Sequence, residues 1–247
     1  MNEVAALIMT ILTGLGLVAP GPPPKFIARG SIGHDVSYPQ CGRPLPRVSA
    51  FGIVGVANGK PYTGNPCLAR EYAWAAATPG GAAFYMNTAN PGPTTTSLNW
   101  YGQRSPDLSC APGRDAACAY NFGYNAAAAA MSYAQAQTGR STNTMWWLDV
   151  ETANSWSRTD LAANFASIRG SIDYLQRQPG VNVGIYSVPQ MWTRIAGSAR
   201  VALPNWVAGA STLVGARARC VPAGTATGGP VVLTQFVVNG FDTNYAC

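Results

Sequence analysis

The segment "TMWWLDVE" (144 to 151) has the pattern of a buried β-strand that ends in acidic residues. Side chains two residues apart in a strand point to the same face, so Trp147, Asp149 and Glu151 project together. The chain has only ten acidic residues among 247, and two of them follow this apolar run. The pattern therefore predicts a strand that carries a pair of carboxyl groups at its carboxyl end.

Seven other segments have a strand-like composition, and helix-like segments lie between most of them. The strand candidates are residues 31–37, 50–57, 82–89, 181–187, 205–210, 231–237 and 240–244, and the helix candidates are residues 67–77, 120–137, 159–177 and 188–197. Such alternation is typical of a parallel sheet, and eight is the strand number of a TIM barrel. After residue 200 no helical period is visible, which indicates that the last three strands are directly connected. We expect an α/β fold with a single TIM-like barrel of the (β/α)5(β)3 type.

The alternative fold is a doubly wound parallel sheet. It has no support from a nucleotide motif, because "GGAAFY" (80 to 85) does not match the GxGxxG pattern. The chain is 47% hydrophobic and 11% charged, and its length suits one large core.

The charge distribution argues against a nucleic-acid partner. The net charge of +6 is scattered, without a run of like charges, and no nucleic-acid-binding motif is present. A scattered positive excess favours general attraction to anionic surfaces such as cell-wall polymers.

Residues 1–24 form a signal-like apolar segment with a Pro-rich spacer. The apolar stretch "VAALIMTILTGLGLV" (4 to 18) is shorter than the roughly 20 residues of a membrane span, so we expect a signal and no stable span. Glu3 stands where a signal usually has basic residues, which leaves an atypical signal, an uncleaved anchor or a misplaced start codon as alternatives. The folded domain is expected at residues 25–247, in a secreted or cell-envelope protein.

Six cysteines are present, without CxxC spacing and with a single histidine, His34. This set predicts disulfides in an oxidising compartment, with six buried thiols as the alternative, and makes a zinc site improbable. Six cysteines allow fifteen connectivities. Closeness along the chain favours the pairs Cys41 with Cys67, Cys110 with Cys118, and Cys220 with Cys247.

Two further acids stand at strand ends, Asp35 in the first candidate and Asp242 in the last. Clustered carboxyl groups in a cleft are typical of glycoside hydrolysis, in which one carboxyl protonates the leaving oxygen and another acts as base, nucleophile or charge stabiliser. Burial and mutual repulsion would raise the pKa of one of them. Solvated strand ends are one alternative. A calcium or magnesium site is another, although the spacing matches no calcium loop. We expect neither a metal nor a cofactor.

Five motifs resemble those of one known family. They are "GHDVSYPQ" (33 to 40), "WWLDVE" (146 to 151), "GIYS" (184 to 187), "NWVAGA" (205 to 210) and "LTQFVVNGFDTN" (233 to 244). In this order they resemble the strand-end motifs of family 25 glycoside hydrolases, the lysozymes of the N,O-diacetylmuramidase type, over most of residues 30–247. The resemblance implies a (β/α)5(β)3 barrel that cleaves the β-1,4 bond between N-acetylmuramic acid and N-acetylglucosamine in peptidoglycan.

The resemblance also implies roles for individual residues. Glu151 resembles the general acid, Asp149 its partner carboxylate, and Asp35 and Asp242 the flanking acids of the cleft. A set of aromatic and polar side chains is expected to contact the glycan: Tyr186, Trp206, Trp156, Tyr85 and Asn87.

Departures from the family pattern concern the second and third strands. Asn65 stands where an Asp is usual, and residues 85–88 replace an aromatic-His-Phe pattern. These changes bear on substrate choice. A catalytically weak or inactive barrel that binds cell-wall glycan is therefore the alternative function, and in both cases we expect a monomer.

Overall fold

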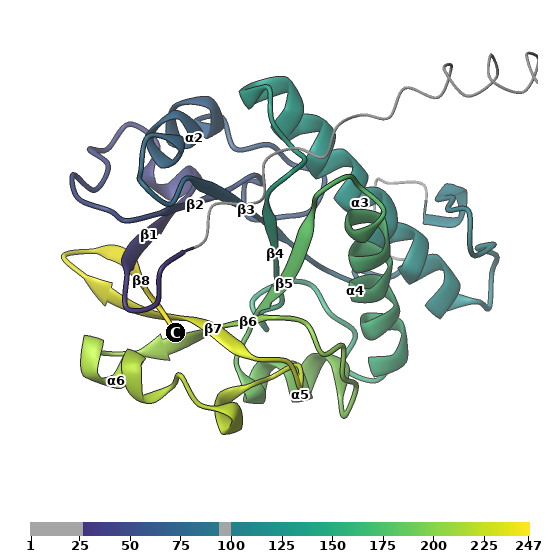
Figure 1. The fold of residues 1–247 in the computed structure, drawn as a ribbon. Helices are drawn as coiled ribbons and strands as arrows, with labels where there is room; N and C mark the ends of the chain where they lie inside the picture. Colours follow the sequence, from purple (N-terminus) through teal and green to yellow (C-terminus); the bar gives the residue numbers. More distant parts are fainter. Residues whose placement is uncertain (1–26, 94–99) are drawn as a thin grey trace, which may run out of the picture.

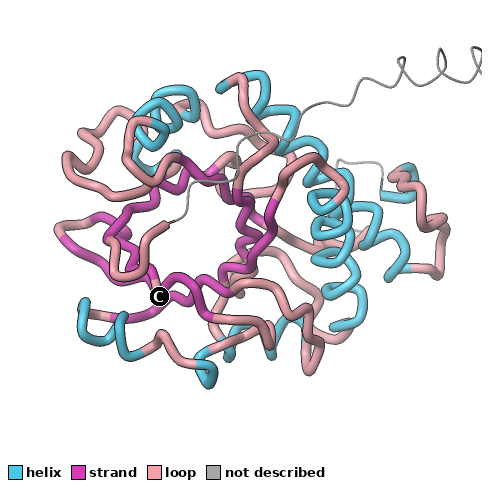
Figure 2. Tube along the Cα trace, viewed as in Figure 1, coloured by secondary structure: helices cyan, strands magenta, loops and turns pink. Residues whose placement is uncertain are grey.

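The computed structural model describes residues 27–93 and 100–247. The apolar segment and spacer expected at 1–24, and the domain boundary expected at residue 25, lie outside these residues. Within the described parts, eight strands form one closed barrel, which Figure 2 shows as a ring with the helices outside it. The strands are β1 (Ile32–Val36), β2 (Gly52–Gly55), β3 (Ala82–Asn87), β4 (Met145–Asp149), β5 (Asn182–Tyr186), β6 (Asn205–Ala210), β7 (Val231–Val238) and β8 (Phe241–Ala246).

The strands follow one another around the barrel in chain order. Neighbours from β1 to β7 are parallel, whereas β8 is antiparallel to both β7 and β1 (Figure 1). The reversal before β8 is a tight hairpin at Asn239 and Gly240, which have φ values of 51° and 76°. Asn-Gly suits such a turn because both residues tolerate positive φ. The expected α/β barrel is confirmed.

Five α-helices connect the strands in the described part of the chain: α2 (Leu68–Ala76), α3 (Asp115–Thr138), α4 (Leu161–Gln176), α5 (Pro189–Ala196) and α6 (Leu213–Ala218). Helix α6 corrects the expectation that the last three strands are directly connected, because it lies between β6 and β7, and only β7 and β8 are joined directly. Its six residues are too few to display a helical period in the sequence. Its start is fixed by Thr212, whose hydroxyl accepts a hydrogen bond from the Gly215 amide at 3.1 Å.

Apolar side chains fill two layers, one on each face of the sheet. Phe84, Trp146 and Leu148 are buried between the sheet and the helices. Trp147 and Trp206 belong to a second cluster inside the barrel. The alternation along β4 therefore separates Trp146 from Trp147, and it turns Asp149 inward with Trp147.

Three disulfides join Cys41 to Cys67, Cys110 to Cys118, and Cys220 to Cys247, the same pairs that closeness along the chain predicts. Among the described residues, no helix is both long and apolar enough to cross a membrane.

Candidate functional site

The four acids of interest lie at one end of the barrel. Asp149 is the last residue of β4, and Glu151 follows two residues later. Asp35 in β1 and Asp242 in β8 are register partners, because β8 runs in the opposite direction and begins at the end where β1 finishes. The structure thus brings these residues to the carboxyl ends of the parallel strands, where barrel enzymes assemble their sites.

Asp149 is buried and held by the neighbouring strand β3. The Asn87 side-chain amide donates to Asp149 Oδ2, and the Thr88 hydroxyl donates to the Asp149 backbone oxygen at 2.6 Å. Asp149 Oδ1 is buried without a hydrogen-bond partner among the described residues. Burial, and secondly the charge of Glu151, raise the pKa of Asp149 well above its ordinary value. The site therefore favours a protonated Asp149.

Glu151 is only partly buried and belongs to the loop between β4 and α4. The indole N–H of Trp156 donates to the Glu151 backbone oxygen at 2.8 Å, and the backbone N–H of Asn154 donates to the same oxygen at 3.1 Å. Burial raises the pKa of Glu151, the neighbouring Asp149 side chain lowers it, and the charge of Asp242 adds to the rise. Asp149 and Glu151 therefore influence each other's titration, and the pair retains a proton at pH values above those at which ordinary carboxyl groups ionise.

Asp35 is the acceptor at the centre of a polar network inside the barrel. Its Oδ2 atom accepts from Gln235 Nε2 at 3.0 Å and from Asn244 Nδ2 at 2.7 Å. The Tyr186 hydroxyl donates to Gln235 Oε1, and the Trp206 indole N–H donates to Asn244 Oδ1, both at 2.8 Å. Burial, and secondly the charge of Asp242, raise the pKa of Asp35 to about 7. The network fixes both aromatic side chains relative to this carboxyl group.

An aromatic group lies beneath the carboxyls. The Trp206 ring is packed edge-on against Tyr186, Trp147 and Tyr85, with ring centroids 4.5, 5.7 and 6.3 Å away. Burial raises the pKa of Tyr186, and the four carboxyls add to this rise electrostatically. Tyr186 therefore experiences the charge of all four acids.

The structure separates the expected glycan contacts into two sets. Tyr85, Asn87, Tyr186 and Trp206 surround the carboxyls, whereas Trp156 lines a neighbouring cavity of about 750 Å³. Two residues of the network, Gln235 and Asn244, were not among the expected site residues. Their signal was present in the sequence, since each is a polar residue two positions from another inward-facing residue of its strand.

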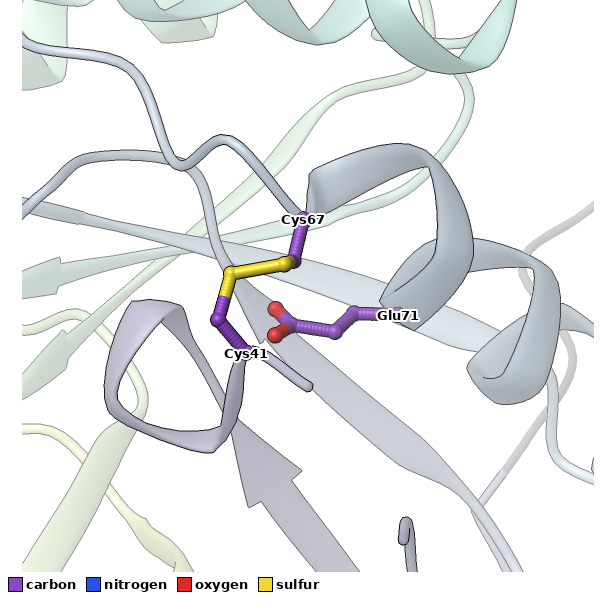
Figure 3. A group of neighbouring side chains, drawn as sticks. All are labelled: Cys41, Cys67 and Glu71. Carbon is purple, nitrogen blue, oxygen red and sulfur yellow. A yellow bond between two sulfur atoms is a disulfide. The ribbon is translucent and has the colours of Figure 1, made fainter. Parts of the chain in front are cut away.

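One further cluster of potential metal ligands consists of Cys41, Cys67 and Glu71 (Figure 3). Its two sulfur atoms are joined in a disulfide, so neither is a thiolate ligand. Glu71 is fully buried, and its Oε2 atom accepts from Asn65 Nδ2 at 2.7 Å. Asn65 also donates to the Gly55 backbone oxygen and accepts from the Cys67 amide. The unusual Asn65 thus connects the second strand to helix α2 and has a structural role.

Comparisons with known proteins agree with this barrel. No protein-family model and no curated protein sequence matches the chain. A muramidase from Trichobolus zukalii has a TM-score of 0.55 and 18% sequence identity, over 88% of this chain and 93% of the muramidase. A family 25 glycosyl hydrolase from Bacillus anthracis has a TM-score of 0.54 and 10% identity, over 92% of this chain and 93% of the hydrolase. The chain therefore shares the fold of these two proteins over most of its length.

Proposed function

We propose that this protein is a glycoside hydrolase of the muramidase type, which cleaves β-1,4 bonds in peptidoglycan. Glu151 acts as the general acid and Asp149 as its partner carboxyl. The observation that carries the proposal is the coupled pair of inward-facing carboxyls at the barrel end, with the pKa of both raised. The fold shared with a muramidase and a family 25 hydrolase supports the choice of substrate.

Glycosidic cleavage needs a proton donor beside the leaving oxygen. Glu151 is suited to this role because it is the more exposed member of the pair, and burial keeps its proton to higher pH than in water. Asp149 is the more deeply buried member, so it acts as the partner carboxyl.

Asp149 has a hydrogen-bonding arrangement that suits contact with substrate. Asn87 donates to Oδ2, and among the described residues nothing donates to Oδ1. A buried oxygen without a partner gains when a ligand supplies one. We assign to Asp149 the orientation of the substrate's N-acetyl group as an internal nucleophile, with Oδ1 as the atom that accepts a hydrogen bond from it.

The remaining site residues form the walls of the glycan subsite. Tyr186 provides aromatic surface, and Trp206 supports the Tyr186 ring from inside the barrel. Asp35 and Asp242 provide hydrogen-bond acceptors for sugar hydroxyls. Three disulfides indicate that the protein works in an oxidising compartment, which agrees with a cell-wall substrate outside the cytoplasm.

The proposal is tested by the replacement Glu151→Gln, which keeps the size of the side chain and removes its proton. Cleavage is followed as turbidity loss and release of reducing ends from purified peptidoglycan, and binding is followed by sedimentation with the same material. We expect the rate to fall about 10²- to 10⁴-fold, the usual contribution of a general acid, while binding is kept.

Asp115→Asn is the matched control, since Asp115 is an exposed acid in the first turn of α3. It should cleave like the wild type. A wild-type protein that binds peptidoglycan without cleaving it would instead identify a glycan-binding module. Full activity of Glu151→Gln would refute the assignment of the acid.

A further inference from the structure

A cavity beside the carboxyl site is lined by residues other than the four acids and their hydrogen-bond network. Its volume is about 750 Å³, and it is formed by residues 90–92 after β3, residues 152 and 154–158 after β4, and residues 194–195 of α5. Trp156 belongs to its wall and is bonded through its indole N–H to the backbone oxygen of Glu151 at 2.8 Å. The cavity therefore adjoins the loop that starts at Glu151, the proposed general acid.

Two arginines give the cavity a positive charge. Arg158 and Arg194 are both exposed, and neither has a hydrogen bond or an ion pair within residues 27–93 and 100–247. Some arginines elsewhere are engaged: Arg177 pairs with Asp107, and Arg219 donates to backbone oxygens. Among the described residues that line the cavity, none is acidic. The two guanidinium groups are thus available to an anionic ligand.

Asn90 supplies a second, independent feature of the cavity wall. Its side-chain N–H donates to Asn164 Oδ1 at 3.0 Å, and Asn164 in turn donates to the backbone oxygens of Ser157 and Ile195. These bonds fix which atom of each amide is oxygen. Within the described part of the chain Asn90 Oδ1 has no hydrogen-bond partner, and the residue is 5% exposed. A buried acceptor in this state is stabilised when a water or a ligand supplies an N–H or O–H donor.

We propose that the cavity binds an acidic substituent of the glycan strand, a group that carries a carboxylate together with an N–H or O–H donor. The carboxylate contacts Arg158 and Arg194, the donor contacts Asn90 Oδ1, and apolar parts of the group lie on the Trp156 ring. A peptide attached to the sugar provides amide N–H groups and carboxylates, and an acidic sugar provides hydroxyls and a carboxylate. The inference rests on the proposed function, because it places this substituent next to the bond that Glu151 would cleave.

The experiment measures binding in the Glu151→Gln background, so that the probes stay intact. The probes are soluble glycan fragments that carry acidic peptides, and the same fragments after enzymatic removal of the peptides. Affinity is compared between this background and the double variant Arg158→Gln/Arg194→Gln. The control Arg47→Gln/Arg114→Gln removes the same charge from two exposed arginines outside the cavity. Thermal unfolding verifies that each variant is folded.

We expect the cavity variant to bind peptide-bearing fragments at least tenfold more weakly, with the control unchanged and with stripped fragments bound equally by all variants. An equal weakening for both kinds of fragment would support the anion site and assign the anion to a sugar. Unchanged affinity of the cavity variant for both would overturn the inference. Cleavage is measured separately in proteins that retain Glu151, so a protein that binds through these arginines but cleaves nothing would contradict the hydrolase proposal alone.

Discussion

At the scale of single residues, the position of Asp35 makes the stability of the protein depend on pH. Its pKa is raised from an ordinary value of 3.8 to about 7, chiefly by burial and then by the charge of Asp242. Between these pH values the folded protein retains a proton that the unfolded chain releases. The stability that this proton provides is present below about pH 4 and is lost as the pH rises through about 7.

The replacement Asp35→Asn should therefore flatten the dependence of the melting temperature on pH between 4 and 7. Asn is neutral throughout, and its carbonyl oxygen can still accept from Gln235 and Asn244. One carboxyl contributes at most about 1.4 kcal/mol per pH unit, so melting curves at several pH values suffice to detect the change. Asp115→Asn is the control and should keep the wild-type slope. An unchanged slope in Asp35→Asn would mean that Asp35 is ionised in the folded protein.

At the scale of elements, helices α3 and α4 approach each other through two glycines. A Cβ atom at Gly123 would lie 1.8 Å from the Ser167 backbone oxygen, and one at Gly170 would lie 2.0 Å from the Tyr120 backbone oxygen. The approach also lets the Ser171 hydroxyl donate to the Gly123 backbone oxygen at 2.9 Å. Side chains larger than hydrogen at these positions would separate the two helices.

We expect Gly123→Ala to destabilise the protein by about 1–3 kcal/mol, the usual cost of overpacking, despite the better helix propensity of Ala. Denaturant unfolding measures this difference. Gly215→Ala in α6 is the matched control, because a Cβ atom there would have its nearest neighbour 3.4 Å away, at Thr212 Oγ1. It should be neutral or stabilising by up to about 1 kcal/mol. Equal stability of the two variants would contradict the proposed close contact.

The elements differ in how well the sequence predicts them. Strands such as β4 follow from alternation, and α4 follows from a long helical period, because both patterns are local. The first turns of α3, which begins at Asp115, were missed since "RDAAC" lacks an apolar period, and α6 was missed because of its length.

For the site, too, sequence patterns predict only those relations that join residues close together in the chain. Asp149 and Glu151 lie two residues apart, so their common direction could be predicted. The bonds of Asp35 to Gln235 and Asn244 join residues 200 and 209 positions apart, and they depend on barrel closure, which no local pattern specifies.

At the scale of the whole molecule, the carboxyl site depends on closure of the barrel between its first and last strands. In Figure 1, β8 lies beside β1, and their pairing aligns Asp35 with Asp242. The Cys220–Cys247 disulfide joins the residue after β8 to the segment that follows α6. This bond ties the end of β8 to the rest of the barrel in addition to its hydrogen bonds with β1 and β7.

Removal of this disulfide, as Cys220→Ser/Cys247→Ser, should destabilise the protein more than removal of Cys110–Cys118. The two bonds close loops with sequence separations of 27 and 8 residues. Loop-closure entropy predicts losses of roughly 3.5 and 2.5 kcal/mol, because the longer loop gains more freedom in the unfolded chain. Urea unfolding of both double variants measures the difference. The reverse order would mean that the Cys110–Cys118 bond stabilises the folded state itself, by ordering the segment before α3. It would also mean that the pairing of β8 with β1 does not depend on the Cys220–Cys247 disulfide.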